Sequence, residues 1–344
     1  MRSGSRACSS CSRLLWAAFM AGALFTLIPF SVPAQSPSAQ PSTSLPAMDA
    51  YFVQDPVTLD GLLNEAGWAQ AKPATEFFQT DPIEGAPATE KTEVRVLYDN
   101  LNIYVGIRCL DSEPERIIHN ELKFDANQGN DDSFIMVLDT FADQRNGFYF
   151  QVNPNGARRD GRHNGTATMN ADWNGVWNTM AVITPEGWSA EMVIPLSTLR
   201  FADAENQTWG INFQRVIARK HEMALWTAWQ RDYGITQLTQ AGKLRNLKNL
   251  NRGRILEVKP YSLGGVENRL GDKDNQFKYG VDIKYPLTSE LTLDFTSFTD
   301  FAQIEADRTQ INLTRFDLRY PEKRDFFLEG TEIFEFGSGI STPF

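Results

Sequence analysis

The chain is poor in the residues from which most metal and redox centres are built. It has 3 Cys and 3 His among 344 residues, too few for a disulfide scaffold or a histidine-rich metal centre. It also has fewer bases than acids, 33 Lys+Arg against 43 Asp+Glu, which gives a formal net charge of -10. Because a nucleic-acid site needs clustered cations to neutralise phosphates, this balance argues against a nucleic-acid partner.

The motifs of common enzyme classes are also missing. The sequence contains no G-x-S-x-G, no H-E-x-x-H, no P-loop and no G-x-G-x-x-G. The tightest acidic pair is Asp131-Asp132, but neighbouring residues of a strand point to opposite faces and do not face each other as acid and base. We therefore predict no catalytic residue. What the chain does have is 42% hydrophobic and 12% aromatic residues, which excludes a disordered chain.

Residues 1–34 are typical of a secretory signal peptide. Three arginines without an acid precede an apolar run from Leu14 to Phe30, and small residues follow at 32–34. Residues 35–50 begin with a Pro/Ser-rich stretch that predicts a linker. We expect an exported protein, in the periplasm or outer membrane of a Gram-negative bacterium or at the cell surface.

Residues 51–250 alternate between apolar and polar side chains with the period of β-strands. Val94, Val96 and Tyr98 share one face, and after Asp99-Asn100 the pattern resumes at Ile103, which predicts a hairpin. Further short alternating runs are separated by Gly, Asn, Asp and Pro. This pattern predicts an all-β fold, an antiparallel β-sandwich. Four residues are expected in its core, namely Trp68, Cys109, Trp188 and Trp209.

Candidate binding residues gather in two loops of this region. Sugars present apolar C–H faces ringed by hydroxyls, so a sugar site combines flat aromatic rings with planar polar side chains. Trp173, Asn174 and Trp177 supply both kinds among turn-forming residues, and Arg158 and Arg159 stand in a second polar loop. The alternatives are that one of the two tryptophans is a core residue and that the arginine loop is merely solvated.

Residues 125–132 (DANQGNDD) are rich in oxygen ligands, which suits a structural calcium ion. The spacing is not that of an EF-hand, because Gly129 takes the fifth place and Asn130 the sixth, where glycine is required. The alternative is a solvated turn without a metal. No other cofactor is predicted.

Several segments resemble family 9 carbohydrate-binding modules. The first is LDGLLNEAGW, with Asp60, Gly61, Glu65 and Trp68; VRVLYDNLNIYVGIRC, DDSFIMVLDT, GWSAEMVIP and WGINFQR follow in the same order. The resemblance implies a β-sandwich in which two tryptophans can hold a sugar with help from amide and guanidinium groups. It also implies an association with carbohydrate catabolism.

Residues 255–344 differ from the preceding region. Tyr279, Val281, Ile283 and Tyr285 alternate with polar residues, as in an outer-membrane β-barrel or an ordinary amphipathic sheet. The segment DFAQIEADRTQINLTRFDLRYPEKRDFFLEGTEIFEFG resembles the DUF5916 family, which implies a family-9-like module joined to an outer-membrane barrel. Since a barrel needs at least eight strands, we expect an incomplete set of antiparallel strands, which would contact the outer membrane if the chain continues.

Our leading hypothesis is a secreted carbohydrate-binding module of the cell envelope that recognises an oligo- or polysaccharide by aromatic stacking. One alternative is a periplasmic or surface domain of a barrel protein, structural or in transport, without affinity for sugar. The other is a glycoside hydrolase activity on O-glycosyl bonds, which would rest on the association of such modules with glycan-degrading enzymes.

Overall fold

The computed structural model describes residues 45–164, 169–171, 173–251, 256–269, 272–287 and 292–298. The predicted signal peptide, most of the predicted linker and the most specific DUF5916-like segment lie outside these ranges. Among the described residues, no helix has the length and hydropathy that a membrane crossing requires.

The larger of two packed sheets, sheet A, has nine strands among the described residues. Seven run in the order β1-β14-β12-β6-β7-β8-β9, and β13 joins β12 to β3. Their bounds are β1 (Ala47–Asp49), β3 (Phe78–Asp81), β6 (Ser133–Asp139), β7 (Asn146–Val152), β8 (Arg158–Asn164), β9 (Met169–Asn170), β12 (Asn206–Ile217), β13 (Glu222–Leu225) and β14 (Gly242–Lys248).

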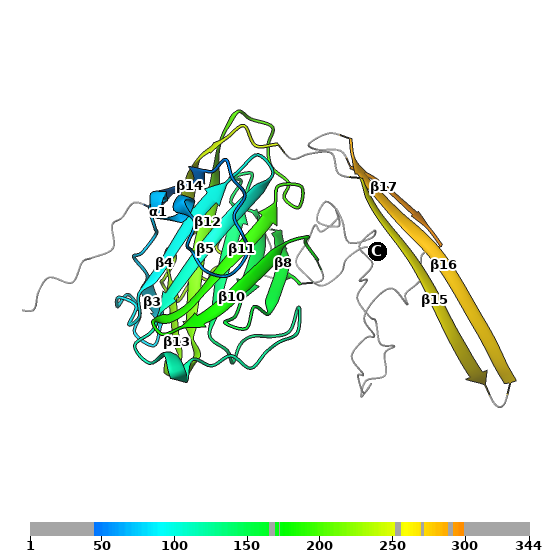
Figure 1. The fold of residues 1–344 in the computed structure, drawn as a ribbon, viewed down its shortest axis with the longest axis horizontal. Coiled ribbons are helices and arrows are strands. Elements are labelled where there is room, and N and C mark those ends of the chain that lie inside the picture. Colours follow the sequence, from blue (N-terminus) through cyan, green and yellow to red (C-terminus); the bar gives the residue numbers. More distant parts are fainter. Residues whose placement is uncertain are drawn as a thin grey trace, which may run out of the picture. The chain divides into compact units, whose positions relative to one another are not determined.

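Sheet B packs face to face on sheet A (Figure 1). Its strands run in the order β10-β11-β5-β4-β2. Their bounds are β2 (Tyr51–Phe52), β4 (Thr92–Tyr98), β5 (Asn102–Leu110), β10 (Asn178–Thr184) and β11 (Gly187–Pro195). The predicted hairpin is confirmed, because β4 and β5 pair antiparallel with Tyr98 opposite Ile103. Together the two sheets confirm the all-β sandwich.

The inward-facing side chains of both sheets form one apolar core. Alternation puts Val94, Val96 and Ile107 of sheet B against Phe134, Met136 and Phe213 of sheet A, all fully buried. The predicted core residues are confirmed there, with Cys109, Trp188 and Trp209 at most 1% exposed. Trp68 is buried in a second, smaller cluster.

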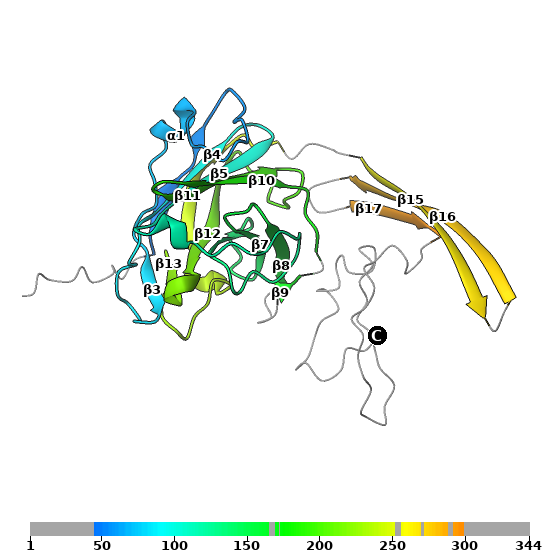
Figure 2. The same cartoon turned by 60° about the horizontal axis from the view of Figure 1, so that its bottom comes forward.

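Helical structure is confined to one α-helix and three short 3₁₀ turns among the described residues. The bounds are α1 (Ala66–Gln70), η1 (Pro114–Arg116), η2 (Ala218–Lys220) and η3 (Leu238–Gln240). Helix α1 lies on the outer side of sheet B (Figure 2), where Trp68 packs on Leu97 and Tyr104. Gly106 of β5 makes room for that ring, since a Cβ there would come within 2.6 Å of it.

A buried carboxylate holds residues 59–68 (LDGLLNEAGW) on sheet B. Glu191 of β11 accepts hydrogen bonds from the backbone N–H groups of Asp60, at 3.0 Å, and Gly61, at 2.9 Å. It also accepts one from Trp68 Nε1 at 3.0 Å. Burial raises the pKa of Glu191 to about 7. These residues therefore have a structural role, which is to fasten the segment before α1 to the sandwich.

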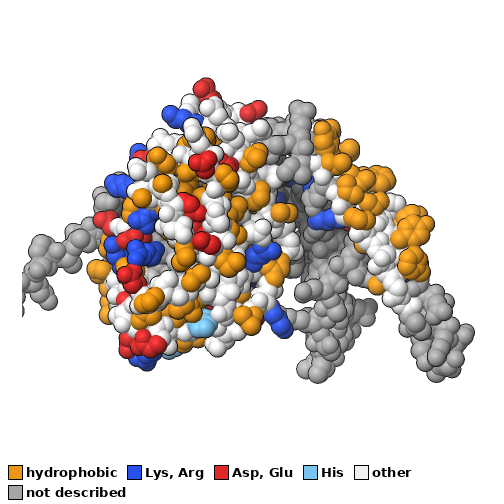
Figure 3. Space-filling view, viewed as in Figure 1, with side chains coloured by type: hydrophobic (Ala, Val, Ile, Leu, Met, Phe, Trp, Pro, Cys, Tyr) orange, Lys and Arg blue, Asp and Glu red, His pale blue; other side chains and the backbone are white. Residues whose placement is uncertain are grey.

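A third sheet, sheet C, is formed by β15 (Glu257–Arg269), β16 (Asp272–Pro286) and β17 (Thr292–Ser297). All pairings are antiparallel, with Val258 opposite Ile283 and Ile283 opposite Phe295. The alternation of Tyr279, Val281, Ile283 and Tyr285 therefore predicted β16 correctly. Figure 3 shows hydrophobic side chains following the strands of this sheet.

Candidate functional site

Trp177, which the sequence predicts as a stacking platform, lies in the core between sheets A and B. Its ring is 1% exposed and meets Phe150 edge-on, with 5.2 Å between ring centroids. Its Nε1 donates to Oδ2 of Asp160 at 2.9 Å, and the N–H of Gly175 donates to the same oxygen at 2.7 Å. Burial raises the pKa of this carboxyl to about 6. A ring without an exposed face cannot stack on a sugar, so the role predicted for Trp177 does not fit its position.

Trp173 and Asn174 lie in the same turn but keep contact with solvent. The half-buried Trp173 ring lies over Phe148 and Phe150, with ring centroids 5.3 and 6.3 Å away. Gly175 accommodates it, because a Cβ there would come within 2.5 Å of the ring. Asn174 is exposed. That these two residues bind sugar stays a prediction.

The prediction that Arg158 and Arg159 stand in a loop is wrong, because both belong to β8. As neighbours on a strand they point to opposite faces. Arg158 donates to the carbonyl of Trp177 and, at 2.8 Å, to Oδ1 of Asn178. Its guanidinium lies 5.0 Å from the centroid of the Phe124 ring. Arg159 instead pairs in register with Gln151 of β7. The two arginines therefore do not form one clamp, and only Arg159 lies on the face of sheet A away from the core.

Six residues form a row that crosses this outer face of sheet A. Their neighbours along the strands, among them Phe134, Phe150 and Phe213, belong to the core, so alternation places the row on the opposite face. We call it the transverse row. Each member is the register partner of the next: Arg159 of β8, Gln151 of β7, Ile135 of β6, Gln214 of β12, Leu225 of β13 and Phe78 of β3.

A chain of hydrogen bonds fixes the middle of the transverse row. The hydroxyl of Tyr149 donates to Oε1 of Gln151 at 2.8 Å, and Nε2 of Gln151 donates to Oγ of Ser133 at 3.2 Å. Burial raises the pKa of Tyr149 to about 12, so its hydroxyl keeps the proton that it donates. The amide of Gln151 is thus held in one orientation.

Two polar groups on the transverse row have no such partner. The guanidinium of Arg159 and the amide of Gln214 make no hydrogen bond or ion pair among the described residues. Gln214 is 6% exposed, yet its amide is not closed off from solvent. Burying a polar group without a hydrogen bond costs free energy. Arg159 and Gln214 lie on either side of Gln151 and Ile135. A polar ligand bound there could form hydrogen bonds with both unpaired groups.

The far end of the transverse row is aromatic. Phe78 packs against Trp229, with 6.1 Å between ring centroids. Trp229 is partly exposed, and a Cβ on Gly85, whose φ is +75°, would come within 3.0 Å of its ring. Arg231 ties this loop to β3, because its guanidinium donates to the carbonyls of Thr80, at 3.1 Å, and of Pro82, at 2.8 Å. Trp229 is thereby held at a fixed place.

The segment between β13 and β14 covers the neighbouring part of the outer face. Oδ1 of Asn212 accepts from the N–H of Thr227 at 3.0 Å, and its Nδ2 donates to the Thr227 carbonyl at 3.1 Å. Further along, Leu238 packs on Val137 and Tyr149. The same cluster includes Ile135, so this cover reaches the middle of the transverse row, where Ile135 and Gln151 are each 5% exposed. The transverse row carries no carboxylate, thiol or imidazole, so the chemistry it can perform is binding by hydrogen bonds and stacking.

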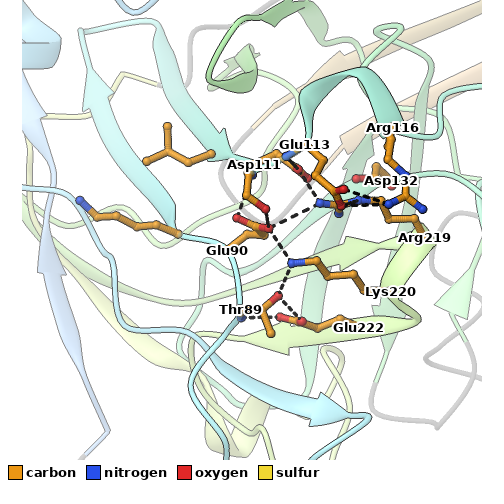
Figure 4. Close-up of polar contacts among 12 residues, drawn as sticks. Thr89, Glu90, Asp111, Glu113, Arg116, Asp132, Arg219, Lys220 and Glu222 are labelled. Carbon is orange, nitrogen blue, oxygen red and sulfur yellow. Dashed lines mark hydrogen bonds and ion pairs between the residues drawn. The ribbon is translucent and has the colours of Figure 1, made fainter.

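A second polar cluster, at one end of the sandwich, consists of charges that neutralise one another (Figure 4). Asp111 accepts from Arg219 at 2.6 Å, and Lys220 lies 2.5 Å from Glu90. Glu222 accepts the hydroxyl of Thr89 at 2.6 Å. These contacts join the ends of β5 and β12 to the start of β13. The cluster is a structural clasp rather than a ligand site.

The predicted calcium loop makes its bonds within the protein. Asp131 accepts from the N–H of Glu121 at 2.8 Å and from Nδ2 of Asn153 at 2.9 Å, whereas Asp132 accepts from the N–H of Ala218 at 3.0 Å. The two acids thus have separate partners, as expected from their adjacency. In the part of the chain that the structure describes, no group of three or more acidic, histidine or cysteine side chains is placed to hold a metal ion. That this loop binds calcium stays a prediction.

Comparison with known proteins bears on both regions of the chain. Residues 254–339 match a family model described as a domain of unknown function, DUF5916, which confirms the resemblance of this segment. No curated protein matches the chain.

Three similar solved structures are described as carbohydrate-binding proteins. A family 9 carbohydrate-binding module from Caldicellulosiruptor kristjanssonii in complex with cellotriose is 17% identical, with 58% of this chain and 92% of that chain covered and a TM-score of 0.42. The family 9 module from the same organism in complex with glucose is 18% identical, with 58% and 94% covered and a TM-score of 0.39. A proposed carbohydrate-binding protein from Bacteroides uniformis is 13% identical, with 59% and 99% covered and a TM-score of 0.46.

Of the transverse row, the sequence predicts only Arg159 as a binding residue. Gln151 and Gln214 stand in alternating strands where polar residues are ordinary, and nothing local distinguishes them. The sequence does carry a signal for Trp229 as a binding residue. Trp229 stands in WTAWQRDYG, where turn-forming residues follow it as they follow Trp173. What could not be read from the sequence is the register that lines these strands up.

Proposed function

We propose that the chain is a carbohydrate-binding module and that the transverse row, with Trp229 at its end, is its ligand site. The observation that carries this is the juxtaposition of unpaired planar polar groups, on Arg159 and Gln214, with an aromatic end at Phe78 and Trp229. Amide and guanidinium groups suit sugar hydroxyls, and an aromatic face suits the apolar C–H face of a pyranose. The sequence resemblance to family 9 modules agrees with this proposal.

Trp229→Ala should weaken saccharide binding by about tenfold or more, because aromatic anchors supply a large share of the free energy at a binding site. Isothermal titration against a panel of oligosaccharides measures this. Tyr51→Ala is the matched control, since it removes an aromatic side chain that is 40% exposed on sheet B, and binding should stay unchanged.

Trp173→Ala discriminates between the two candidate places on the surface. Loss of binding in this variant with full binding in Trp229→Ala would move the site to the turn before β10 and contradict our assignment. Absence of binding to every saccharide by the intact protein would sink the proposed function. Far-ultraviolet circular dichroism shows whether each variant has kept its fold.

We also propose export and a place in the cell envelope, with a role in carbohydrate catabolism. The basic and apolar N-terminal residues support export, and the resemblance to family 9 modules supports the role in catabolism. Detection of the chain in periplasmic and membrane fractions, with the first 34 residues removed, is the test. A chain that stays in the cytoplasm with its N-terminus intact would contradict it.

A second proposed function, attachment to a membrane, is favoured by one face of sheet C. Its apolar residues are strongly exposed, with Phe277 and Phe298 at 73%, Tyr279 at 64%, Leu293 at 55% and Phe295 at 54%. The other face carries the charged residues Lys278, Asp282, Lys284 and Asp294, together with Tyr261 and Leu263. Exposed apolar patches of this kind mark contact surfaces, and the two-residue period is that of strands in contact with lipid.

Replacing Phe277 and Phe295 together by glutamine should therefore lower the fraction of protein that floats with phospholipid vesicles by severalfold, because it removes two large apolar side chains from the exposed face. Leu263→Gln changes an apolar residue of the polar face and should leave flotation unaltered. Equal flotation of all three proteins, or no flotation of the intact protein, would contradict membrane attachment through this face.

A further inference from the structure

Arg159 is a partly buried arginine that has no acidic partner among the described residues. Among the described residues, Arg95 pairs with Glu93, Arg231 with Asp81 and Arg245 with Asp49, each at 3.0 or 3.1 Å. Arg159 makes no ion pair or hydrogen bond in the same part of the chain. This is a chain in which acids outnumber bases by 43 to 33, so a partly buried cation left without an acid calls for an explanation.

The neighbour of Arg159 on the transverse row is a neutral amide. Across the ladder Arg159 faces the amide of Gln151, which is already bonded to Tyr149 and Ser133. The Tyr149 hydroxyl, whose pKa burial raises to about 12, stays protonated and adds no negative charge near Arg159. No carboxylate belongs to the transverse row, so nothing on it competes for the guanidinium.

Resting on the proposed function, we propose that the saccharide bound along the transverse row carries an anionic substituent, a carboxylate or a sulfate, that pairs with Arg159. A guanidinium presents two parallel N–H donors that match two oxygens of such a group. Hydrogen bonds between ionised partners are about twice as strong as neutral ones. Gln151 and Gln214 remain for hydroxyls, and Phe78 and Trp229 for the apolar face of a neighbouring ring.

The test compares ligands that differ only in charge. Isothermal titration uses uronic-acid oligosaccharides, the same oligosaccharides with their carboxylates methyl-esterified, and neutral oligosaccharides bearing or lacking sulfate. We expect one acidic member to bind at least about tenfold more tightly than its neutral counterpart, as for one charge-assisted pair. The preference should shrink as salt is raised from about 0.05 to 0.5 M, because a partly exposed pair is screened. The carboxylate and sulfate arms tell the two anions apart.

Arg159→Gln should abolish the preference, lowering affinity for the acidic ligand about tenfold with little change for the neutral one. Arg159→Lys should retain part of it, because the charge stays while the two-pronged geometry is lost. Arg145→Gln is the control: it removes the same charge from an exposed position in the β6–β7 turn, and the preference should persist.

The two proposals fail in distinguishable ways. Equal affinity for charged and neutral ligands, with binding still sensitive to Trp229→Ala, would overturn the inference and leave the proposed function standing. A preference for the acid that survives Arg159→Gln would overturn the inference as well. No binding to any arm would overturn both.

Discussion

Trp177→Ala should lower the free energy of unfolding by about 3–5 kcal/mol, the usual cost of removing a large aromatic ring from a core. The ring is 1% exposed and packs edge-on against Phe150. Oδ2 of Asp160 accepts one hydrogen bond from Trp177 and one from the N–H of Gly175, and the substitution removes the first. Urea denaturation followed by circular dichroism measures the change.

Two further variants separate packing from binding. Trp177→Phe keeps most of the ring but loses the bond to Asp160, so it should cost less, about 1–3 kcal/mol. Trp173→Ala removes a half-buried ring and should cost less than Trp177→Ala. Unchanged stability of Trp177→Ala together with loss of saccharide binding would instead restore Trp177 as a ligand platform.

The direction in which Trp177 points could not be predicted from the sequence. Asn and Gly around it correctly indicated a turn, but a turn can direct a tryptophan into the core as well as outwards. What decides the direction is the carboxylate of Asp160, 17 residues earlier in the chain, which takes the indole N–H. A contact of that kind leaves no trace in local composition.

The hairpin of β4 and β5 could be predicted in detail because its two strands are joined by a short turn. Alternation and turn residues, both local, were sufficient there. The transverse row is the opposite case. Gln151 and Arg159 belong to neighbouring strands, but Gln214 and Phe78 come from distant parts of the chain. Their alignment depends on the register of five strand pairs, and a shift of one residue in any of them would break it.

Alternation predicted β16 and its two faces, because one strand is enough to show which residues share a face. Alternation does not show what the apolar face of sheet C contacts. The same period occurs where a sheet meets lipid and where it meets other protein. Vesicle flotation is therefore the experiment that separates these two cases.

Asp111→Ala should be as destabilising as the loss of Trp177, by about 3–5 kcal/mol, because it breaks a buried ion pair by removing one partner. The Asp111 side chain is 0% exposed, and its two oxygens lie 2.6 Å from Nη2 of Arg219 and 3.8 Å from Nη2 of Arg215. Both guanidinium groups are buried, with side-chain exposures of 6% and 1%. Without Asp111, Arg219 keeps only its longer contacts with Glu90 and Glu113, each at 3.5 Å, and Arg215 loses the acid 3.8 Å from it. Urea denaturation measures the cost.

The control for Asp111→Ala lies in the same cluster. Arg116→Ala breaks an exposed pair with Glu113, whose side chains are 62% and 44% exposed, and should cost less than about 1 kcal/mol. Combining Asp111→Ala with Arg219→Met removes one of the stranded cations, so the double variant should be less destabilised than the sum of the two single ones. Strict additivity would show that Asp111 acts through packing alone. An excess of stability in the double variant would instead show that the charge cluster of Figure 4 stabilises the fold by keeping the buried guanidinium of Arg219 paired.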